Sequence, residues 1–218
     1  MKIIDLTHVI EQAMPVFPGT EPPKLQLANT LEKDGFLEHI ITMYSHTGTH
    51  MDAPSHMAKD GLNLDEMPIS QFIGKALLID VAGLKQVSTA IGLEDLYEYR
   101  AQINQVDFLI LKTNWSDYWG EEKYFKGFPA LTEEAADWLT TFNLKGIGID
   151  AISIDAMETT DFKNHHIFFN KGMVIIENLT NLASIDREEF LFSCLPLKTL
   201  KADGSPVRAI AILTDTVE

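Results

Sequence analysis

Cysteine is nearly absent from this chain, because Cys194 is the only one among its 218 residues. An intramolecular disulfide is therefore impossible. Cys194 lies in the apolar run of residues 190–195. We expect it to be a small buried side chain rather than a reactive thiol.

Long hydrophobic runs are missing as well. No stretch approaches the roughly 20 apolar residues that a membrane-spanning helix needs. The N-terminal residues 1–6 acquire an acidic residue too early for a secretory signal. Together these features predict a cytoplasmic protein.

Positive charge is scarce. Seventeen Lys and Arg residues stand against 32 Asp and Glu residues, which gives a formal net charge of -15, and the basic residues form no cluster. Such a surface repels nucleic-acid phosphates and anionic lipid. We therefore expect neither nucleic acid nor a membrane as a partner, and the acidic balance remains compatible with an enzyme that acts on a small molecule.

The composition is otherwise that of a globular domain, with 45% hydrophobic and 22% charged residues. A chain of this length fits one domain, and no repeat or Pro/Gly/Ser-rich linker divides it. We predict a single domain over residues 1–218.

Short apolar runs rich in β-branched residues alternate with amphipathic stretches. The latter predict helices over residues 93–100 and 132–142, the second with Thr132 as its N-cap. Strands mixed with helices indicate the α/β class. The apolar runs predict strands over residues 2–6, 39–44, 76–81, 106–112, 146–149, 173–176 and 207–213.

Two segments are predicted to be irregular. Residues 14–19 contain two prolines and a glycine. Residues 114–130 form a long segment that is rich in aromatic side chains. This second segment is either a lid or pocket wall, or a loop held in place by its own aromatic residues.

Four potential metal ligands or proton carriers, His46, His50, Asp52 and His56, lie within eleven residues at offsets 0, 4, 6 and 10. In a helix Asp52 would point away from the face shared by His46 and His50. In an extended chain every even offset faces the same side. The four side chains can converge only if this segment curls, and the glycine and proline between them permit a curl.

Neutral imidazoles and a carboxylate bind zinc, manganese or iron. A site without cysteine ligands fits a catalytic metal better than a structural one, because a catalytic site keeps a position for water. The metal lowers the pKa of that water towards ~7 and so supplies hydroxide. We therefore predict a metal-dependent hydrolase. His8 and His39 stand alone in the sequence and are expected to be structural.

A second candidate segment spans residues 164–178 and contains His165, His166 and Glu177. Glu177 ends an apolar run. It is either a carboxylate that projects from a strand end into a pocket or a solvated strand end, and the sequence leaves both interpretations open.

The run His46-Thr-Gly-Thr-His50-Met-Asp52-Ala-Pro-Ser-His56 resembles the signature of the Putative cyclase family. This family consists of metal-dependent hydrolases and includes bacterial kynurenine formamidases and isatin hydrolases. The resemblance extends from residues 4–7 through residues 148–155 to residues 165–177. It implies a single swivelling β/β/α domain with a mixed sheet and flanking helices, and a homodimer or homotetramer.

The resemblance also implies roles for individual residues. One or two divalent ions are expected, zinc first, with manganese or iron as alternatives. His56 matches the proton donor and acceptor. His46 and His50 match ligands of one metal, Asp52 matches the carboxylate that can bridge to a second, and the ligands of that second metal match His165 and Glu177.

The loop of residues 15–19 matches the place where formamidases have a tryptophan that packs on the aromatic substrate. Phe17 takes that place here and is expected to bind substrate, with a smaller ring and no indole donor. Asp150, Ser153 and Asp155 recur in the family motif. We expect them to make local backbone hydrogen bonds rather than to take part in catalysis.

The predicted reaction is hydrolysis of a carbon–nitrogen bond in a small amide or formamide, as in arylformamidases. One alternative keeps the metal and changes the substrate to a cyclic imide or lactam, or to an ester or lactone. Another is a non-catalytic metal-binding protein on the same fold. The last is an α/β protein whose histidines lie on the surface.

Overall fold

A strand of only three residues, β4 (His50–Asp52), closes the main sheet. It pairs with β10 on one side and with β12 on the other, so that the pairings run in a closed circuit. The structure, a computed structural model, describes residues 1–84 and 90–214. Within these residues the sheet contains β1 (Lys2–Asp5), β4, β5 (Ile73–Asp80), β7 (Phe108–Lys112), β9 (Gly146–Ile149), β10 (Val174–Glu177), β11 (Glu189–Pro196) and β12 (Gly204–Leu213).

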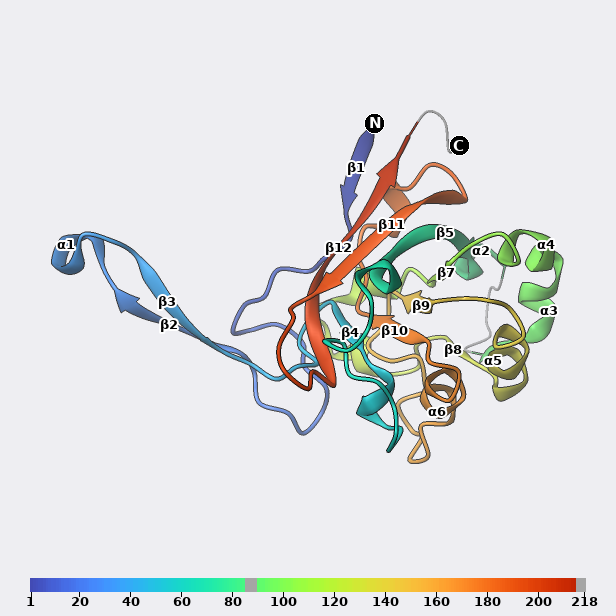
Figure 1. Cartoon of the computed structure of the whole chain (residues 1–218), viewed down its shortest axis with the longest axis horizontal. Coiled ribbons are helices and arrows are strands. Elements are labelled where there is room, and N and C mark those ends of the chain that lie inside the picture. Colours follow the sequence, from blue (N-terminus) through green and yellow to red (C-terminus); the bar gives the residue numbers. More distant parts are fainter. Residues whose placement is uncertain (85–89, 215–218) are drawn as a thin grey trace.

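The strand order is β1-β12-β11-β5-β7-β9-β10-β4 (Figure 1). Strands β5, β7, β9 and β10 are parallel, and the pairings of β11, β12, β1 and β4 are antiparallel. The parallel strands are almost wholly buried, as expected for strands covered on both faces. The predicted α/β class with a mixed sheet is therefore confirmed.

Alternate strand residues divide the hydrophobic core in two. Phe108, Ile110, Phe190 and Phe192 belong to the cluster enclosed by the circuit of strands, where the rings of Phe108 and Phe192 meet edge to face at 5.3 Å. Leu109 and its neighbours on the opposite face pack against the helices. Cys194 is fully buried in the first cluster, and burial raises the pKa of its thiol, as expected for an inert side chain.

The helices are short. Thr132 caps α5 by accepting a hydrogen bond from the Ala135 amide, which confirms the predicted N-cap. The helix predicted over residues 93–100 is instead broken into α3, a 3₁₀ turn (Tyr97–Tyr99) and α4. The helices are α1 (Leu31–Asp34), α2 (Val81–Leu84), α3 (Leu93–Leu96), α4 (Arg100–Ile103), α5 (Glu133–Leu139) and α6 (Lys163–Phe169).

Each predicted strand corresponds to an observed one, but one of them lies outside the main sheet. Strand β3 (Glu38–Thr42) pairs with β2 (Lys24–Asn29) in a hairpin that projects from the body of the molecule (Figure 1). The sequence analysis missed β2, β4 and β11. It also missed the two-residue strands β6 (Ala90–Ile91) and β8 (Ala130–Leu131).

The aromatic segment of residues 114–130 is held by its own side chains. The Trp115 indole N–H donates to the Tyr124 carbonyl oxygen at 2.9 Å, and Trp119 stacks on His8 with ring centroids 3.7 Å apart. Tyr124 is completely buried. No described residue of this segment lines the main cavity. Of the two interpretations, the loop held by its own aromatics is the one that fits.

Across residues 1–84 and 90–214, the helices are all too short or too polar to cross a bilayer. The cytoplasmic location stays a prediction.

His8 gives a testable pH dependence. Burial lowers the pKa of its imidazole to about 4, and an unfolded histidine titrates near ~6.5. Between these values the unfolded chain binds more protons than the folded one, so stability falls as the pH falls through this window. His8→Phe keeps a stacked ring but cannot titrate.

Between pH 7.5 and pH 4.5 we expect its free energy of unfolding to fall by about 1–2 kcal/mol less than that of the wild type, a figure that allows for partial solvent screening. Urea unfolding at pH 7.5 and pH 4.5 measures it. His166→Phe, at an exposed position, is the control and should lose as much stability between the two pH values as the wild type does. If His8→Phe also loses as much as the wild type, His8 is not held neutral.

Candidate metal centre

The predicted curl of residues 46–56 is present, and Gly48 and the turn that begins at Pro54 produce it. Gly48 has φ +64, which favours glycine. The chain then enters β4 and, after Ala53, turns through the 3₁₀ helix Pro54–His56. On the neighbouring strand Gly204 leaves room for an imidazole, because a Cβ there would lie 2.5 Å from His46 Cε1. Glu177 stands directly opposite His50 in the β10–β4 pairing.

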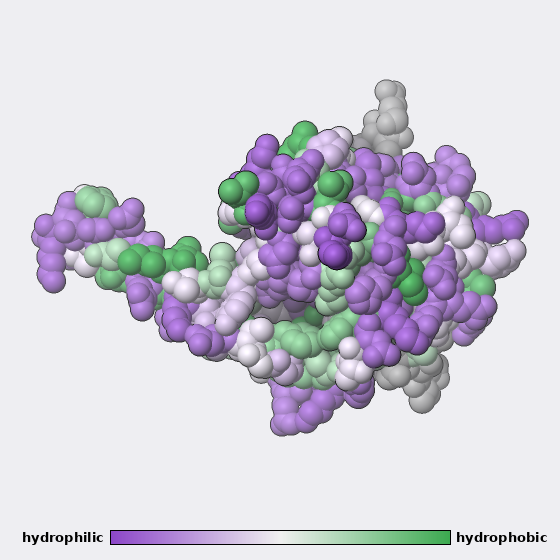
Figure 2. All heavy atoms as spheres, turned by 60° about the horizontal axis from the view of Figure 1, so that its bottom comes forward, coloured by the Kyte–Doolittle hydropathy of each residue, from purple (hydrophilic) through white to green (hydrophobic). Residues whose placement is uncertain are grey.

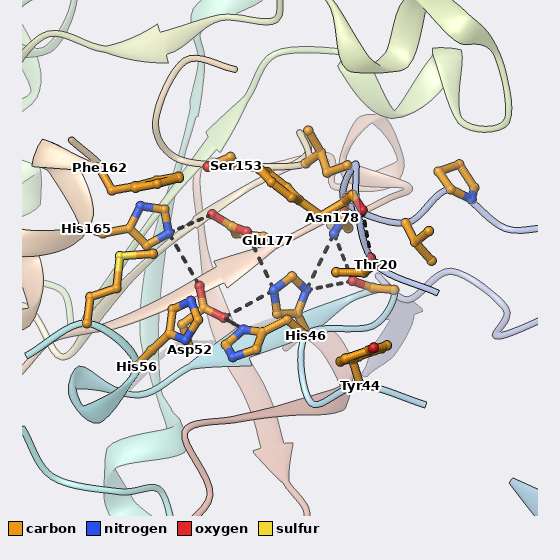
Figure 3. A pocket seen from close by; sticks show the side chains of 17 residues that line it. Thr20, Tyr44, His46, Asp52, His56, Ser153, Phe162, His165, Glu177 and Asn178 are labelled. Atoms are coloured by element: carbon orange, nitrogen blue, oxygen red, sulfur yellow. Dashed lines mark hydrogen bonds and ion pairs between the residues drawn. The ribbon is translucent and has the colours of Figure 1, made fainter. Parts of the chain in front are cut away.

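One group of side chains surrounds the Oδ1 atom of Asp52. His46 Nδ1 lies 2.5 Å from this oxygen (Figure 3). His50 Nε2 lies 3.1 Å from it. His50 and Asp52 are buried, and His46 is partly buried. Two imidazole nitrogens and one carboxylate oxygen therefore face a common point.

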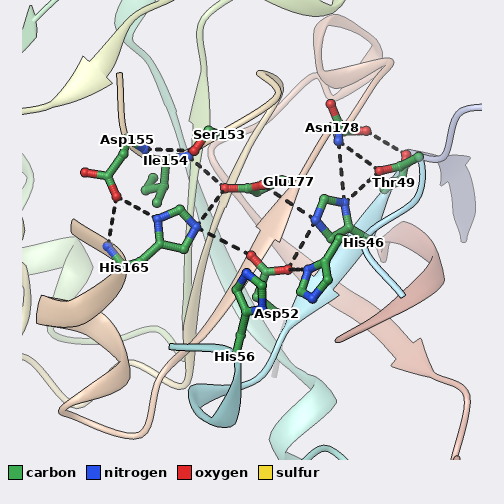
Figure 4. Close-up of polar contacts among 12 residues, drawn as sticks. His46, Thr49, Asp52, His56, Ser153, Ile154, Asp155, His165, Glu177 and Asn178 are labelled. Carbon is green, nitrogen blue, oxygen red and sulfur yellow. Dashed lines mark hydrogen bonds and ion pairs between the residues drawn. The ribbon is translucent and has the colours of Figure 1, made fainter. Parts of the chain in front are cut away.

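A second group surrounds the other oxygen of the same carboxylate. His165 Nε2 lies 3.7 Å from Asp52 Oδ2 and 3.4 Å from Glu177 Oε1 (Figure 4). Glu177 is buried and accepts a hydrogen bond from the Ile154 amide at 2.8 Å. The carboxylate of Glu177 at the end of β10 therefore points into the cavity rather than into solvent. His165 comes from α6, a helix that the sequence analysis did not predict, and its neighbour His166 is exposed.

The remote nitrogen of each of these three imidazoles has its own acceptor. His50 Nδ1 lies 2.8 Å from the Gly48 carbonyl oxygen, and His165 Nδ1 lies 2.6 Å from Asp155 Oδ2. His46 Nε2 lies 3.1 Å from Asp203 Oδ2. Such acceptors fix the tautomer and ring orientation of histidines that bind metals.

Two of these acceptors were missed. Asp155 was expected to bond only to local backbone. It does accept the Asn164 and His165 amides, but it also holds the His165 ring. Asp203 lies outside every motif in the sequence, and only the pairing of β12 with β4 brings it near His46. Asp150 accepts the amide and the hydroxyl of Thr113, which lies 37 residues away, so these hydrogen bonds are not the local ones expected.

The charges of the site favour a cation. Burial would lower the pKa of His46, but Asp52 and Asp203 outweigh it and raise that pKa to about 9. Burial likewise opposes charge on His165, whose pKa is nevertheless raised by Asp155, Asp52 and Glu177. The carboxylates therefore favour positive charge on His46 and His165. A divalent ion would supply the same compensating charge, and the nitrogen and oxygen donors suit one.

His56 stands beside both groups. Its ring centroid is 3.9 Å from that of His46, and its Nδ1 is 3.6 Å from Asp203 Oδ2. Burial, and then the neighbouring His46, lower the pKa of His56. A neutral imidazole at the wall of the cavity can accept a proton.

These side chains form the floor of a cavity of about 260 Å³. Phe17 lines it, together with its neighbours Pro15 and Val16, and substrate binding by Phe17 stays a prediction. No Lys or Arg occurs among the described residues around it, so the cavity offers no fixed cation for an anionic substrate. Its apolar wall consists of Pro15, Val16, Phe17, Tyr44, Met57, Ile152 and Phe162.

Asp203→Asn tests the contact between Asp203 and His46 Nε2, which the sequence did not predict. The change weakens the acceptor at His46 Nε2, so we expect metal to bind about 10- to 100-fold more weakly to the group around His46. Competition with a chromogenic chelator measures this affinity. Asp60→Asn, at an exposed position, is the matched control and should bind metal like the wild type. Equal affinities for Asp203→Asn and the control would rule out the assigned contact.

Known proteins resemble this chain in sequence and in fold. The kynurenine formamidase of Bacillus cytotoxicus is 32% identical over 208 residues, which cover 95% of each chain. A solved structure of isatin hydrolase A from Labrenzia aggregata, bound to benzyl benzoate, superposes with a TM-score of 0.89 at 25% identity, covering 98% of this chain and 94% of the other. A structure described as a predicted metal-dependent hydrolase from Bacillus stearothermophilus has a TM-score of 0.79 at 29% identity, with 96% and 97% covered. The profile of the family described as Putative cyclase matches residues 4–156, and this chain belongs to that family.

Proposed function

We propose that this protein is a metal-dependent hydrolase that cleaves the carbon–nitrogen bond of a small formamide or amide. The observation that carries the proposal is the buried Asp52 carboxylate, whose two oxygens face two separate groups of ligand atoms. The similarity to kynurenine formamidases over 95% of the chain supports the reaction class.

The ligand sets that we propose follow the two groups. His46, His50 and Asp52 would hold one ion, and Asp52, His165 and Glu177 a second. A divalent ion supplies Lewis-acid chemistry, since it lowers the pKa of water towards ~7 and polarises a carbonyl. Zinc is our first choice, because mixed nitrogen and oxygen ligands suit it, and manganese and iron accept the same ligands.

The cavity would bind the substrate through its apolar wall. Phe17 and Phe162 can pack on an aromatic ring, and the acyl carbon then reaches the floor formed by Asp52 and Glu177. Because no Lys or Arg is present among the described lining residues, the proposed substrate carries no anionic group that must be paired inside the cavity.

His56 is the proposed proton carrier. As a neutral imidazole it accepts a proton from the water that adds to the carbonyl carbon. It then donates that proton to the nitrogen as the carbon–nitrogen bond breaks, so that an acid and an amine leave. Asp203, 3.6 Å from its Nδ1, would hold the protonated ring between the two steps.

A second candidate substrate is a cyclic amide of the isatin type. The cavity favours it for a specific reason. An uncharged bicyclic ring matches an apolar wall without Lys or Arg better than a free amino acid with a charged α-amino and α-carboxylate group does. The bond that breaks is again a carbon–nitrogen bond, so the roles of the residues do not change.

A substrate panel with metal removal tests the reaction class. Protein dialysed against a chelator should lose hydrolysis of formanilides and isatin and regain it with Zn²⁺ or Mn²⁺. Lactones form the third arm of the panel, and the compound with the highest kcat/KM identifies the substrate class. Hydrolysis that persists in verified metal-free protein would refute a metal-dependent mechanism.

His56→Ala tests the proton carrier. We expect kcat to fall about 10²- to 10⁴-fold, because general acid–base transfer is lost, while bound metal per chain stays constant. Metal analysis and steady-state kinetics on the same preparation measure both. His166→Ala, at the exposed neighbour of His165, should keep full activity. If His56→Ala loses its metal and recovers the full rate on re-addition, His56 is a ligand instead.

We also propose that residues 1–218 form one functional domain and that it assembles as a homodimer or homotetramer. The pairing of β1 with β12 supports the first proposal, because it joins an early and a late segment of the chain in one sheet. The projecting hairpin supports the second.

A further inference from the structure

Two polar side chains in the interior have no part in the chemistry described above. Hydrophilic residues cover much of the face shown in Figure 2, but Asn178 is only 5% exposed and Tyr124 is completely buried. Asn178 directly follows the proposed ligand Glu177 and lines the cavity with it. A buried polar group is costly unless it is hydrogen-bonded, so both side chains need partners inside the protein.

The side chain of Asn178 links Tyr124 to His50. Its Oδ1 accepts the Tyr124 hydroxyl at 2.6 Å, and its Nδ2 donates to the Gly48 carbonyl oxygen at 2.9 Å. The same carbonyl oxygen lies 2.8 Å from His50 Nδ1. A carbonyl oxygen has two lone pairs, so it can accept from Asn178 and His50 together.

This arrangement determines which nitrogen of His50 can bind a metal. The Gly48 carbonyl oxygen can only accept, so His50 Nδ1 carries a hydrogen. Asn178 Nδ2 lies 3.5 Å from His50 Nδ1, and because both are donors they share the carbonyl oxygen. In the neutral ring Nε2 then has a free lone pair, and it lies 3.1 Å from Asp52 Oδ1.

The backbone of Asn178 holds the next residue of the curl. Its carbonyl oxygen accepts the Thr49 hydroxyl at 2.6 Å (Figure 4). Thr49 Oγ1 in turn accepts the His8 amide at 2.9 Å. Asn178 has φ 56, a left-handed conformation that asparagine adopts more readily than most residues. One residue therefore holds both Gly48 and Thr49, which directly precede His50.

The aromatic segment of residues 114–130 supports both contacts from outside the cavity. The Tyr124 ring meets the Trp119 ring edge to face at 5.2 Å, and Trp119 stacks on His8. Burial raises the pKa of Tyr124 well above its usual range, so its hydroxyl stays a donor at neutral pH. The segment thus reaches the neighbourhood of His50 although none of its described residues lines the cavity.

We propose that Asn178 is a positioning residue of the metal centre and that Tyr124 acts through it. Together they hold the Gly48 carbonyl oxygen where it orients the His50 ring. The inference rests on the proposed function, because His50 requires this orientation only if it binds a metal. Both polar atoms of the Asn178 side chain already have protein partners, which favours positioning over contact with the substrate.

Replacement of Asn178 by glycine removes the side chain alone, because glycine adopts a positive φ freely. Asn181→Gly is the matched control. Asn181 has φ 57, and its side chain donates to the Asp5 carbonyl oxygen at 2.9 Å, but this residue is exposed and does not line the cavity. Both variants lose one asparagine side chain from the same backbone conformation.

Co²⁺ is the probe, because it accepts nitrogen and oxygen ligands and its visible absorption depends on their geometry. His46→Ala identifies the absorption of the ion bound beside His50, since it should abolish that part of the spectrum. Asn178→Gly should bind this ion about 10- to 100-fold more weakly than the wild type, and Asn181→Gly equally tightly. Equal affinities for the two glycine variants would overturn the proposal.

The absorption spectrum at saturating Co²⁺ separates positioning from a general loss of stability. A less stable protein that still orients His50 gives the wild-type band once it is saturated. We expect Asn178→Gly to shift this band and Asn181→Gly to leave it in place. If both saturated variants show the wild-type band, the Asn178 side chain is merely structural and the proposal is wrong.

Tyr124→Phe tests the second half of the link. It keeps the buried ring and removes the hydroxyl, so it gives a result even if Asn178→Gly fails to fold. We expect Co²⁺ to bind about tenfold more weakly, whereas Tyr118→Phe in the same segment should match the wild type. In the Asn178→Gly background Tyr124→Phe should cause no further loss. Additive losses would show that Tyr124 does not act through Asn178.

The outcomes separate this inference from the proposed function. If Asn178→Gly raises KM for the best compound of the substrate panel but binds Co²⁺ like the wild type, Asn178 contacts the substrate and the inference is wrong. If the panel shows no hydrolysis but the Co²⁺ results are as expected, only the reaction class falls. A wild type that binds no Co²⁺ would refute the metal centre and the inference together.

Discussion

The buried carboxylate of Asp52 is the constraint around which the rest of the site is arranged. Removing a negative charge from water is costly unless opposite charge surrounds it. Asp52 meets this demand with His46 and His50 at one oxygen and His165 at the other. Burial opposes its charge, yet the imidazoles hold its pKa well below the usual range. Asp52 is therefore an ionised carboxylate, the form in which it can bind a cation.

The fold brings together proposed metal ligands that are far apart in the sequence. His50 and Asp52 lie on β4, Glu177 lies on the adjoining β10, and His165 lies on α6 just before it. Asp155 receives the first amides of α6 and the His165 ring on the same carboxylate. The orientation of the helix and the orientation of the imidazole therefore depend on one side chain.

The sequence allowed correct predictions where the informative residues lie together in one short segment. The spacing of His46 to His56 indicated a one-sided, curled array, and the β-branched runs located the core strands. Strand β4 was not predicted because a three-residue strand leaves no periodic pattern. Helix α6 was not predicted because it has only seven residues and its buried face includes the polar Asn164 and His165. Asp203 could not be predicted, because its role exists only once β12 lies beside β4.

The pairing of β4 with both β10 and β12 has a consequence for the stability of the sheet. The strand that carries His50 and Asp52 is also the one that completes the sheet, by pairing on both sides. Any local opening that separates these strands must pull the ligand atoms apart. An ion held there adds its binding free energy to the cohesion of the sheet, since it binds the closed form alone. The proposed metal centre then also stabilises the sheet, whose resistance to local opening depends on the occupancy of that centre.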